Sequence, residues 1–205
     1  PPSTREAGAM LPLLREHRSA LVASILLMIG VASSTYIIVY YLSNYAVSVL
    51  HMPLSLGIWA ACIAALVQVL LSPFAGRLAD RIGRRKVVLW SRVALLAMIY
   101  PAFALINAEP SLARLLLVVG CLSVPMSMTS PASMVLVSEV LPQRLRATGL
   151  SIAYCVAIAI FGGFAQFFST ELIHLTGNAN APAFYVIGCG LVSLVGLAMV
   201  PETLG

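Results

Sequence analysis

Six apolar stretches, each long enough to cross a membrane as a helix, constrain this chain more than any other feature. The hydrocarbon core of a bilayer requires about 20 helical residues. The stretches cover residues 19–46, 54–76, 87–107, 112–138, 148–170 and 181–201. Only 9% of the residues are charged, whereas a soluble domain carries roughly a quarter. The sequence therefore predicts an all-α membrane protein with six transmembrane helices, and it excludes a water-soluble fold.

The distribution of Lys and Arg predicts the orientation of these helices. The connections are short and rich in turn-forming residues, so consecutive helices should run antiparallel. Ten of the twelve Lys and Arg then lie near helix ends on one side, whereas Arg114 lies on the other side and Arg92 inside the third stretch. Loops rich in Lys and Arg stay in the cytoplasm. We therefore expect a multi-pass protein of the cell (inner) membrane, in contact with membrane lipids, with both termini in the cytoplasm.

The composition argues against several other functions. The net charge of +5 does not indicate nucleic-acid binding, because the cations form no patch on a polar domain. The four cysteines have no metal-binding spacing and are predicted to be small, buried core residues. They are Cys62, Cys121, Cys155 and Cys189. No catalytic constellation or cofactor motif is visible within the helices. An enzyme is not expected, and a non-transport six-helix membrane protein stays open as an alternative.

The loop between the second and third stretches carries the most specific motif, the sequence GRLADRIGRRK at residues 76–86. Gly76 and Gly83 permit a tight turn with positive φ, and five cations favour contact with an anionic leaflet. A plain cytoplasmic loop does not explain the single acid, Asp80, between the two glycines. The whole pattern, G-x3-D-R-x-G-R-R, resembles the signature loop of the major facilitator superfamily. That loop joins the second and third helices of each six-helix half of these proteins.

A second loop supports the same resemblance. Glu139 and the sequence PQRLRATG at residues 142–149 are similar to the equivalent loop of the superfamily's sugar and metabolite porters. We expect Glu139 to pair with Arg84 or Arg146, and Asp80 to lie at the positive N-terminal end of the fifth helix. The resemblance implies a cytoplasmic gate that opens when the cavity opens inward; a simple surface ion-pair cluster is the alternative. The implied gate residues are Gly76, Asp80, Arg81, Gly83, Arg84, Arg85, Glu139, Arg144 and Arg146.

The two ends of the chain suggest which half is present. The closing sequence PETLG at residues 201–205 resembles the end of the final helix in many porters, and residues 1–18 look like a remnant of the central cytoplasmic loop. The resemblance implies that residues 19–205 are the C-terminal six-helix half of a twelve-helix transporter. The partner of this half would be the missing N-terminal half.

Polar side chains on the first helix indicate a cavity. Ser33, Tyr36, Tyr40 and Asn44 recur at spacings of three and four, which places them on one helix face. A polar face in a membrane avoids lipid and lines a bundle interior or a wet cavity. Two further candidate cavity residues are Gln68 and Ser127, although the serines of the fourth helix suit close helix packing equally well.

An arginine and a pair of glycines inside the helices each have a specific expected role. Arg92 is expected to extend toward the inner membrane surface, and a less favoured interpretation has it face the cavity and attract an anionic substrate. The pair Gly162 and Gly163 is expected to permit a close helix contact or a bend.

Residues 159–164, 175–177 and Pro182 are most similar to the metabolite:proton symporter family. That resemblance implies a secondary active transporter that takes up a small organic acid, such as citrate or α-ketoglutarate, together with protons. The substrate would bind near the midplane between two halves that rock against each other. No acid lies in the middle of a helix, so the proton carrier is expected in the missing half. A proline/betaine symporter and a drug-exporting antiporter remain the alternatives within transporters.

Overall fold

The computed structural model describes residues 17–48, 53–109 and 111–200. Its elements in chain order are α2 (Arg18–Thr35), η1 (Tyr36–Tyr41), α3 (Leu42–Ser48), α4 (Leu54–Ile82), α5 (Arg84–Ala108), α6 (Leu112–Val140), α7 (Arg146–Val156), η2 (Ala157–Gly162), α8 (Ala165–Thr176) and α9 (Ala181–Met199). Both η segments are π-helical. The predicted segment 1–18 and the closing residues 201–205 lie almost entirely outside the described residues.

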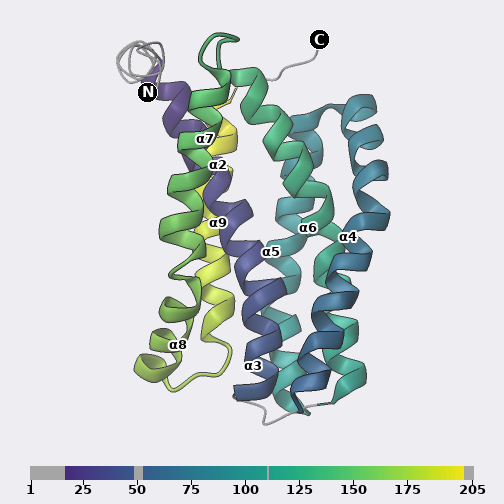
Figure 1. The fold of residues 1–205 in the computed structure, drawn as a ribbon. Coiled ribbons are helices and arrows are strands. Elements are labelled where there is room, and N and C mark those ends of the chain that lie inside the picture. Colours follow the sequence, from purple (N-terminus) through teal and green to yellow (C-terminus); the bar gives the residue numbers. More distant parts are fainter. Residues whose placement is uncertain (1–16, 49–52, 110, 201–205) are drawn as a thin grey trace, which may run out of the picture.

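The described helices form six spans that are long and apolar enough to cross a membrane. The segments α2, η1 and α3 make one continuous span, and α7, η2 and α8 make another. The spans lie side by side in a bundle and alternate in direction (Figure 1). The start of α2, the α4–α5 turn, the α6–α7 connection and the end of α9 all lie at one end. The predicted all-α, six-helix fold is confirmed, whereas the side on which this end lies stays a prediction.

The loop predicted between the second and third spans is shorter than expected. Helix α4 continues to Ile82 and α5 begins at Arg84, so Gly83 alone makes the turn, with φ of 99°. The prediction that Gly76 also contributes to a turn is wrong, because Gly76 lies inside α4. A helix satisfies its own backbone hydrogen bonds in water as well as in lipid. The end of an apolar run therefore does not mark the end of the helix.

Helix α2 lies at the centre of the packing. It contacts α9, η2, α7 and α6, while α5 packs against α6 and α9, and α4 packs mainly against α6. The first span is the most buried of the six, and α4 and the span from Arg146 to Thr176 are the least buried. The latter two spans therefore present large apolar faces to the outside of this bundle.

The prediction that all four cysteines are buried is wrong. Only Cys189 is buried, and Cys62, Cys121 and Cys155 lie on the outer surface of the bundle. Lipid tails are as apolar as a protein core, so no hydrophobic force drives a small apolar side chain away from them. Apolar character alone could not distinguish inward from outward positions here.

Gly162 at the end of η2 packs against the ring of Tyr36 at the start of η1. A methyl group on Gly162 would lie 2.8 Å from two ring carbons of Tyr36, so a larger residue here would force the ring or the helix to move. The span also breaks after η2, because α8 starts afresh at Ala165. Just before this break, the Tyr185 hydroxyl on α9 donates a hydrogen bond to the Phe161 carbonyl in η2 at 2.6 Å. The close helix contact, one of the two interpretations expected for this pair, is confirmed at Gly162.

Candidate functional site

A cavity of about 190 Å³ lies between the first span, α4, α6 and the α7–η2 segment. Its polar lining comes from four different helical spans, which only the folded bundle brings together. These polar residues are Thr35, Tyr36, Tyr40, Gln68, Ser130 and Tyr154. Apolar side chains such as Met28 and Met134 complete the wall. A cavity of mixed lining with a few convergent polar groups suits a small solute.

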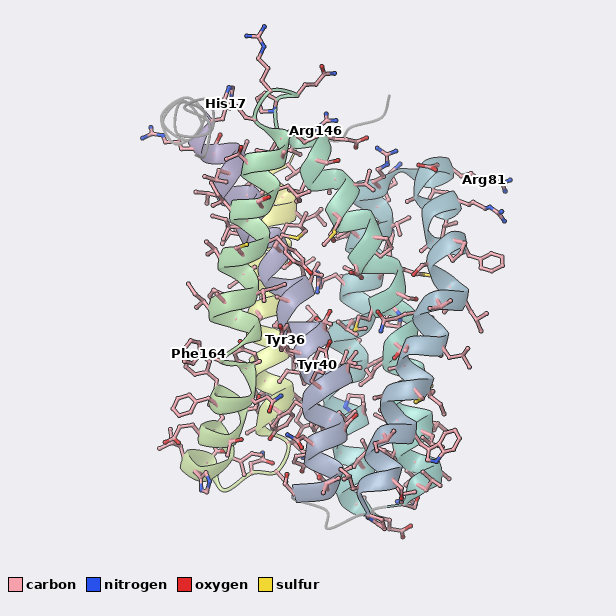
Figure 2. All side chains as sticks on the ribbon, in the orientation of Figure 1. His17, Tyr36, Tyr40, Arg81, Arg146 and Phe164 are labelled. Carbon is pink, nitrogen blue, oxygen red and sulfur yellow. The ribbon has the colours of Figure 1, made fainter. Side chains whose placement is uncertain are left out.

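Tyr36 and Tyr40 form the aromatic side of this cavity. Their ring centroids are 5.2 Å apart and the ring planes are inclined by 49°. Figure 2 shows both rings near the middle of the bundle's length. Within the described part of the chain, neither hydroxyl forms a hydrogen bond, and the Gln68 side-chain amide also forms none. These three polar groups are therefore available to orient a bound solute.

The other predicted cavity residues do not line this cavity. Ser33 and Ser127 are buried in helix contacts, where their hydroxyls donate to the carbonyls of Gly30 at 3.4 Å and Val124 at 2.7 Å. Asn44 is exposed, and its amide donates to the Gln166 side chain at 3.5 Å.

The π-helical turn at η1 explains part of this difference. A π-bulge adds one residue to a turn, which rotates all later residues by about 100° relative to an α-helical count. Asn44 follows η1 and is therefore carried off the expected face. Thr35, Ser130 and Tyr154 also line the cavity. Ser130 is one of the fourth-helix serines for which a cavity role was one of two interpretations. Nothing in the sequence spacing linked Thr35 and Tyr154 to the other spans.

A cluster of ion pairs joins α4, α5 and α6 at the end of the bundle that holds the α4–α5 turn. The Arg84 guanidinium lies 3.1 Å from the Asp80 carboxylate and also pairs with Glu139. The Arg84 and Glu139 side chains are about three-quarters buried, whereas the Asp80 side chain is 66% exposed. The predicted pairing of Glu139 with Arg84 is confirmed.

The expected position of Asp80 at the start of the fifth span is wrong. Asp80 pairs with Arg84 across the α4–α5 turn, and α6 lies between α4 and α7 in the bundle (Figure 1). Because only the tight turn at Gly83 separates the two residues, this partner is close to Asp80 in the chain and the pair does not depend on how α7 packs. The exposed carboxylate also adjoins a hollow of about 220 Å³ between α4 and α6.

The remaining gate residues surround this cluster without joining its ion pairs in the described structure. Arg81 and Arg144 are exposed, and Arg85 and Arg146 are half-buried. Figure 2 shows Arg81 and Arg146 at the same end of the bundle. The Arg146 Nε atom is buried and has no hydrogen-bond partner among the described residues. The structure therefore places these four cations at one end, with Arg84 as the residue that links three helices.

The prediction that Arg92 reaches the inner membrane surface is wrong. Its side chain is buried, with 1% of the residue exposed. Its Nη1 atom donates to the Gly30 carbonyl at 2.6 Å and to the Ser34 hydroxyl at 3.2 Å. Nε and Nη2 are buried without a hydrogen-bond partner in the described structure. The Gly30 carbonyl on α2 binds the guanidinium instead. The sequence of α5 alone does not show that α2 lies beside Arg92.

These features define a class of protein. Six membrane-spanning helices, a polar cavity at mid-length and an ion-pair cluster at one end are the parts of a half-unit of a membrane transporter. The family model described as "Sugar (and other) transporter" matches residues 3–205. The chain therefore belongs to the sugar transporter family of the major facilitator superfamily.

The curated relatives are named for several different substrates. The chain is 29% identical to a citrate-proton symporter of Salmonella typhi, over 97% of this chain and 45% of the relative. It is 30% identical to an alpha-ketoglutarate permease of Escherichia coli K12, over 93% of this chain and 44% of the relative. It is 27% identical to the proline/betaine transporter of the same organism, over 88% of this chain and 36% of the relative. No solved structure is significantly similar to the chain. The chain spans less than half the length of these relatives.

Proposed function

We propose that the intact protein is a secondary active transporter that takes up a small organic acid together with protons. The substrates that we propose are citrate and α-ketoglutarate. The observation that carries the proposal is the cavity at mid-length, in which the Tyr36 and Tyr40 hydroxyls and the Gln68 amide have no other partner among the described residues. Directed hydrogen bonds orient a small polar solute and suit it better than a large apolar drug. Relatives named for citrate and alpha-ketoglutarate support the same substrate class.

Residues 19–205 would form the C-terminal half of this transporter. The missing N-terminal half would pack on the two least buried spans, α4 and the one from Arg146 to Thr176. These spans expose large apolar side chains, including Phe74, Phe164 and Phe167. The same two spans, with the first span and α6, line the cavity, so the second half would pack beside it. Substrate would then lie between two halves that rock against each other.

We propose that the cluster around Arg84 acts as the cytoplasmic gate. Its ion pairs tie the ends of α4, α5 and α6 together, and the exposed Asp80 carboxylate is open to the missing half. A methyl group on Gly76 would meet nothing within 4 Å in this half. The second half could therefore approach closely there. Gly83, Arg81, Arg85, Arg144 and Arg146 would complete the gate and keep this end in the cytoplasm, with both termini.

Uptake measurements on the intact transporter test the main proposal. Cells or vesicles that contain it should accumulate labelled citrate or α-ketoglutarate when the outside is more acidic. Uptake should collapse when a protonophore removes the gradient, and membranes without the protein provide the control. Uptake of proline or betaine in place of organic acids would support the second candidate, which the proline/betaine relatives favour. Export of a lipophilic cation with no uptake of either would refute the symporter proposal.

A further inference from the structure

Arg92 carries a charge that the described structure does not compensate. The described ion pairs involve Arg84 and Arg114, and both lie at helix ends. The described carboxylates are Asp80, Glu109, Glu139 and Glu171, and none of them pairs with Arg92. Three of them already form ion pairs with Arg84 or Arg114, and Glu171 is exposed on α8. A buried charge without a counter-ion is costly in a membrane, so a purely structural role is a poor explanation for it.

The position of Arg92 relates it to the cavity through helix α2. The guanidinium lies against the Gly30 carbonyl, and a methyl group on Gly30 would lie 2.9 Å from the Arg92 Cζ atom. The next residues, Val31 and Ala32, line the cavity on the other face of the same helix. Arg92 and a bound solute are thus separated by one helix, whose diameter with side chains is about 10 Å.

We propose that Arg92 is a specificity-determining residue whose buried charge, acting across α2, favours anionic substrates over uncharged or zwitterionic ones. This inference rests on the proposed function, because it concerns the solute that binds beside Tyr36. Arg92 does not touch this solute. Its charge instead sets the electrostatic potential of the cavity wall, and the carbonyl of Gly30 and the hydroxyl of Ser34 hold the guanidinium in place.

Coulomb's law gives the size of the effect. Two unit charges about 10 Å apart, with an effective dielectric constant of about 20, attract strongly enough to change an affinity by about tenfold or slightly more. The charges face each other across helix α2 inside the protein, where salt screens them less than at an exposed surface. The loss of affinity on removing the charge should therefore grow with the number of carboxylates on the substrate.

Two matched pairs of variants of the intact transporter test the inference. Arg92→Met removes the charge and Arg92→Lys keeps it. Ser34→Asp places a carboxylate beside the guanidinium, whereas Ser34→Asn has the same shape without the charge. KM is measured for α-ketoglutarate and citrate, and glycine betaine is tested as a zwitterionic competitor without net charge, with the amount of protein in the membrane as the control.

We expect Arg92→Met and Ser34→Asp to raise KM at least tenfold for α-ketoglutarate and more for citrate. Arg92→Lys and Ser34→Asn should stay within about threefold of the wild type, and competition by betaine should not weaken. Equal KM values for Ser34→Asp and Ser34→Asn would overturn the inference, even if the Met variant fails to reach the membrane. Equal effects of Met and Lys at position 92 would also overturn it.

The same variants separate this inference from the proposed function. If the wild type carries betaine and no organic acid, the proposed function fails. Citrate then serves as a competitor of betaine uptake, and its inhibition constant replaces KM. A tenfold rise of that constant in Ser34→Asp relative to Ser34→Asn would support the electrostatic role of Arg92, and no change would refute it.

Discussion

Replacing Gly162 by Ala should weaken substrate binding through the Tyr36 ring. The added methyl group would lie 2.8 Å from the Cδ2 and Cε2 atoms of Tyr36, which is closer than non-bonded carbons approach. Either the ring or the helix must therefore move. Overpacking of this kind costs about 1–3 kcal/mol when the surroundings resist. Tyr36 relieves the contact by rotating about its Cα–Cβ bond, which swings the whole ring and removes its hydroxyl from the cavity.

The size of the effect follows from one lost hydrogen bond. Such a bond contributes about 0.5–1.5 kcal/mol, so the apparent affinity should fall about two- to tenfold. The measurement is the KM for labelled citrate in vesicles that contain equal amounts of transporter. Gly188→Ala is the matched control, because a methyl group there meets nothing within 4 Å. It should leave KM unchanged.

A double-mutant cycle shows whether Tyr36 transmits the effect. In a Tyr36→Ala background the ring is absent, so Gly162→Ala should change KM less than twofold. Contacting residues give such non-additive effects, whereas independent sites add. An equal loss of affinity in both backgrounds would refute the argument, and so would an unchanged KM in Gly162→Ala alone.

Three further experiments test the rest of the site and its orientation. Asp80→Asn should lower the transport rate and leave the amount of protein in the membrane nearly unchanged, because an exposed ion pair contributes about 1 kcal/mol or less; normal transport would reduce the gate to a surface cluster. Tyr40→Phe should raise KM severalfold, whereas Asn44→Ala should change it less than twofold because Asn44 lies off the cavity; the reverse order in uptake assays would contradict the cavity. In a protein without native cysteines, a membrane-impermeant maleimide applied outside intact cells should label His174→Cys and leave Arg81→Cys unlabelled; labelling at position 81 would invert the proposed topology.

Several features of the site could be predicted from local sequence. The motif around Asp80 and the acid at Glu139 were sufficient to predict that Glu139 pairs with Arg84 or Arg146, and the structure shows the pair with Arg84. That pairing needs only two adjacent loops at the same end of neighbouring helices. The prediction for Asp80 was wrong because it required α7 to lie beside α4, which is a matter of tertiary packing. The exposed cysteines were missed for a related reason, since lipid and protein interior are equally apolar.

Sequence by itself determined that the chain crosses a membrane six times. Whether one segment spans the membrane depends on its own apolar length and on the hydrogen bonds within its own helix, not on its neighbours. Tertiary structure alone decided which polar residues share a cavity. The π-helical turn at η1 rotated Asn44 away from Tyr36 and Tyr40, and Gln68 and Tyr154 joined these rings from other spans. Tertiary structure also decided where the Arg92 side chain lies, because its guanidinium donates a hydrogen bond to a carbonyl of α2. Helix periodicity describes one helix at a time, whereas the choice of neighbouring helix and its rotation depends on side-chain packing along the whole bundle.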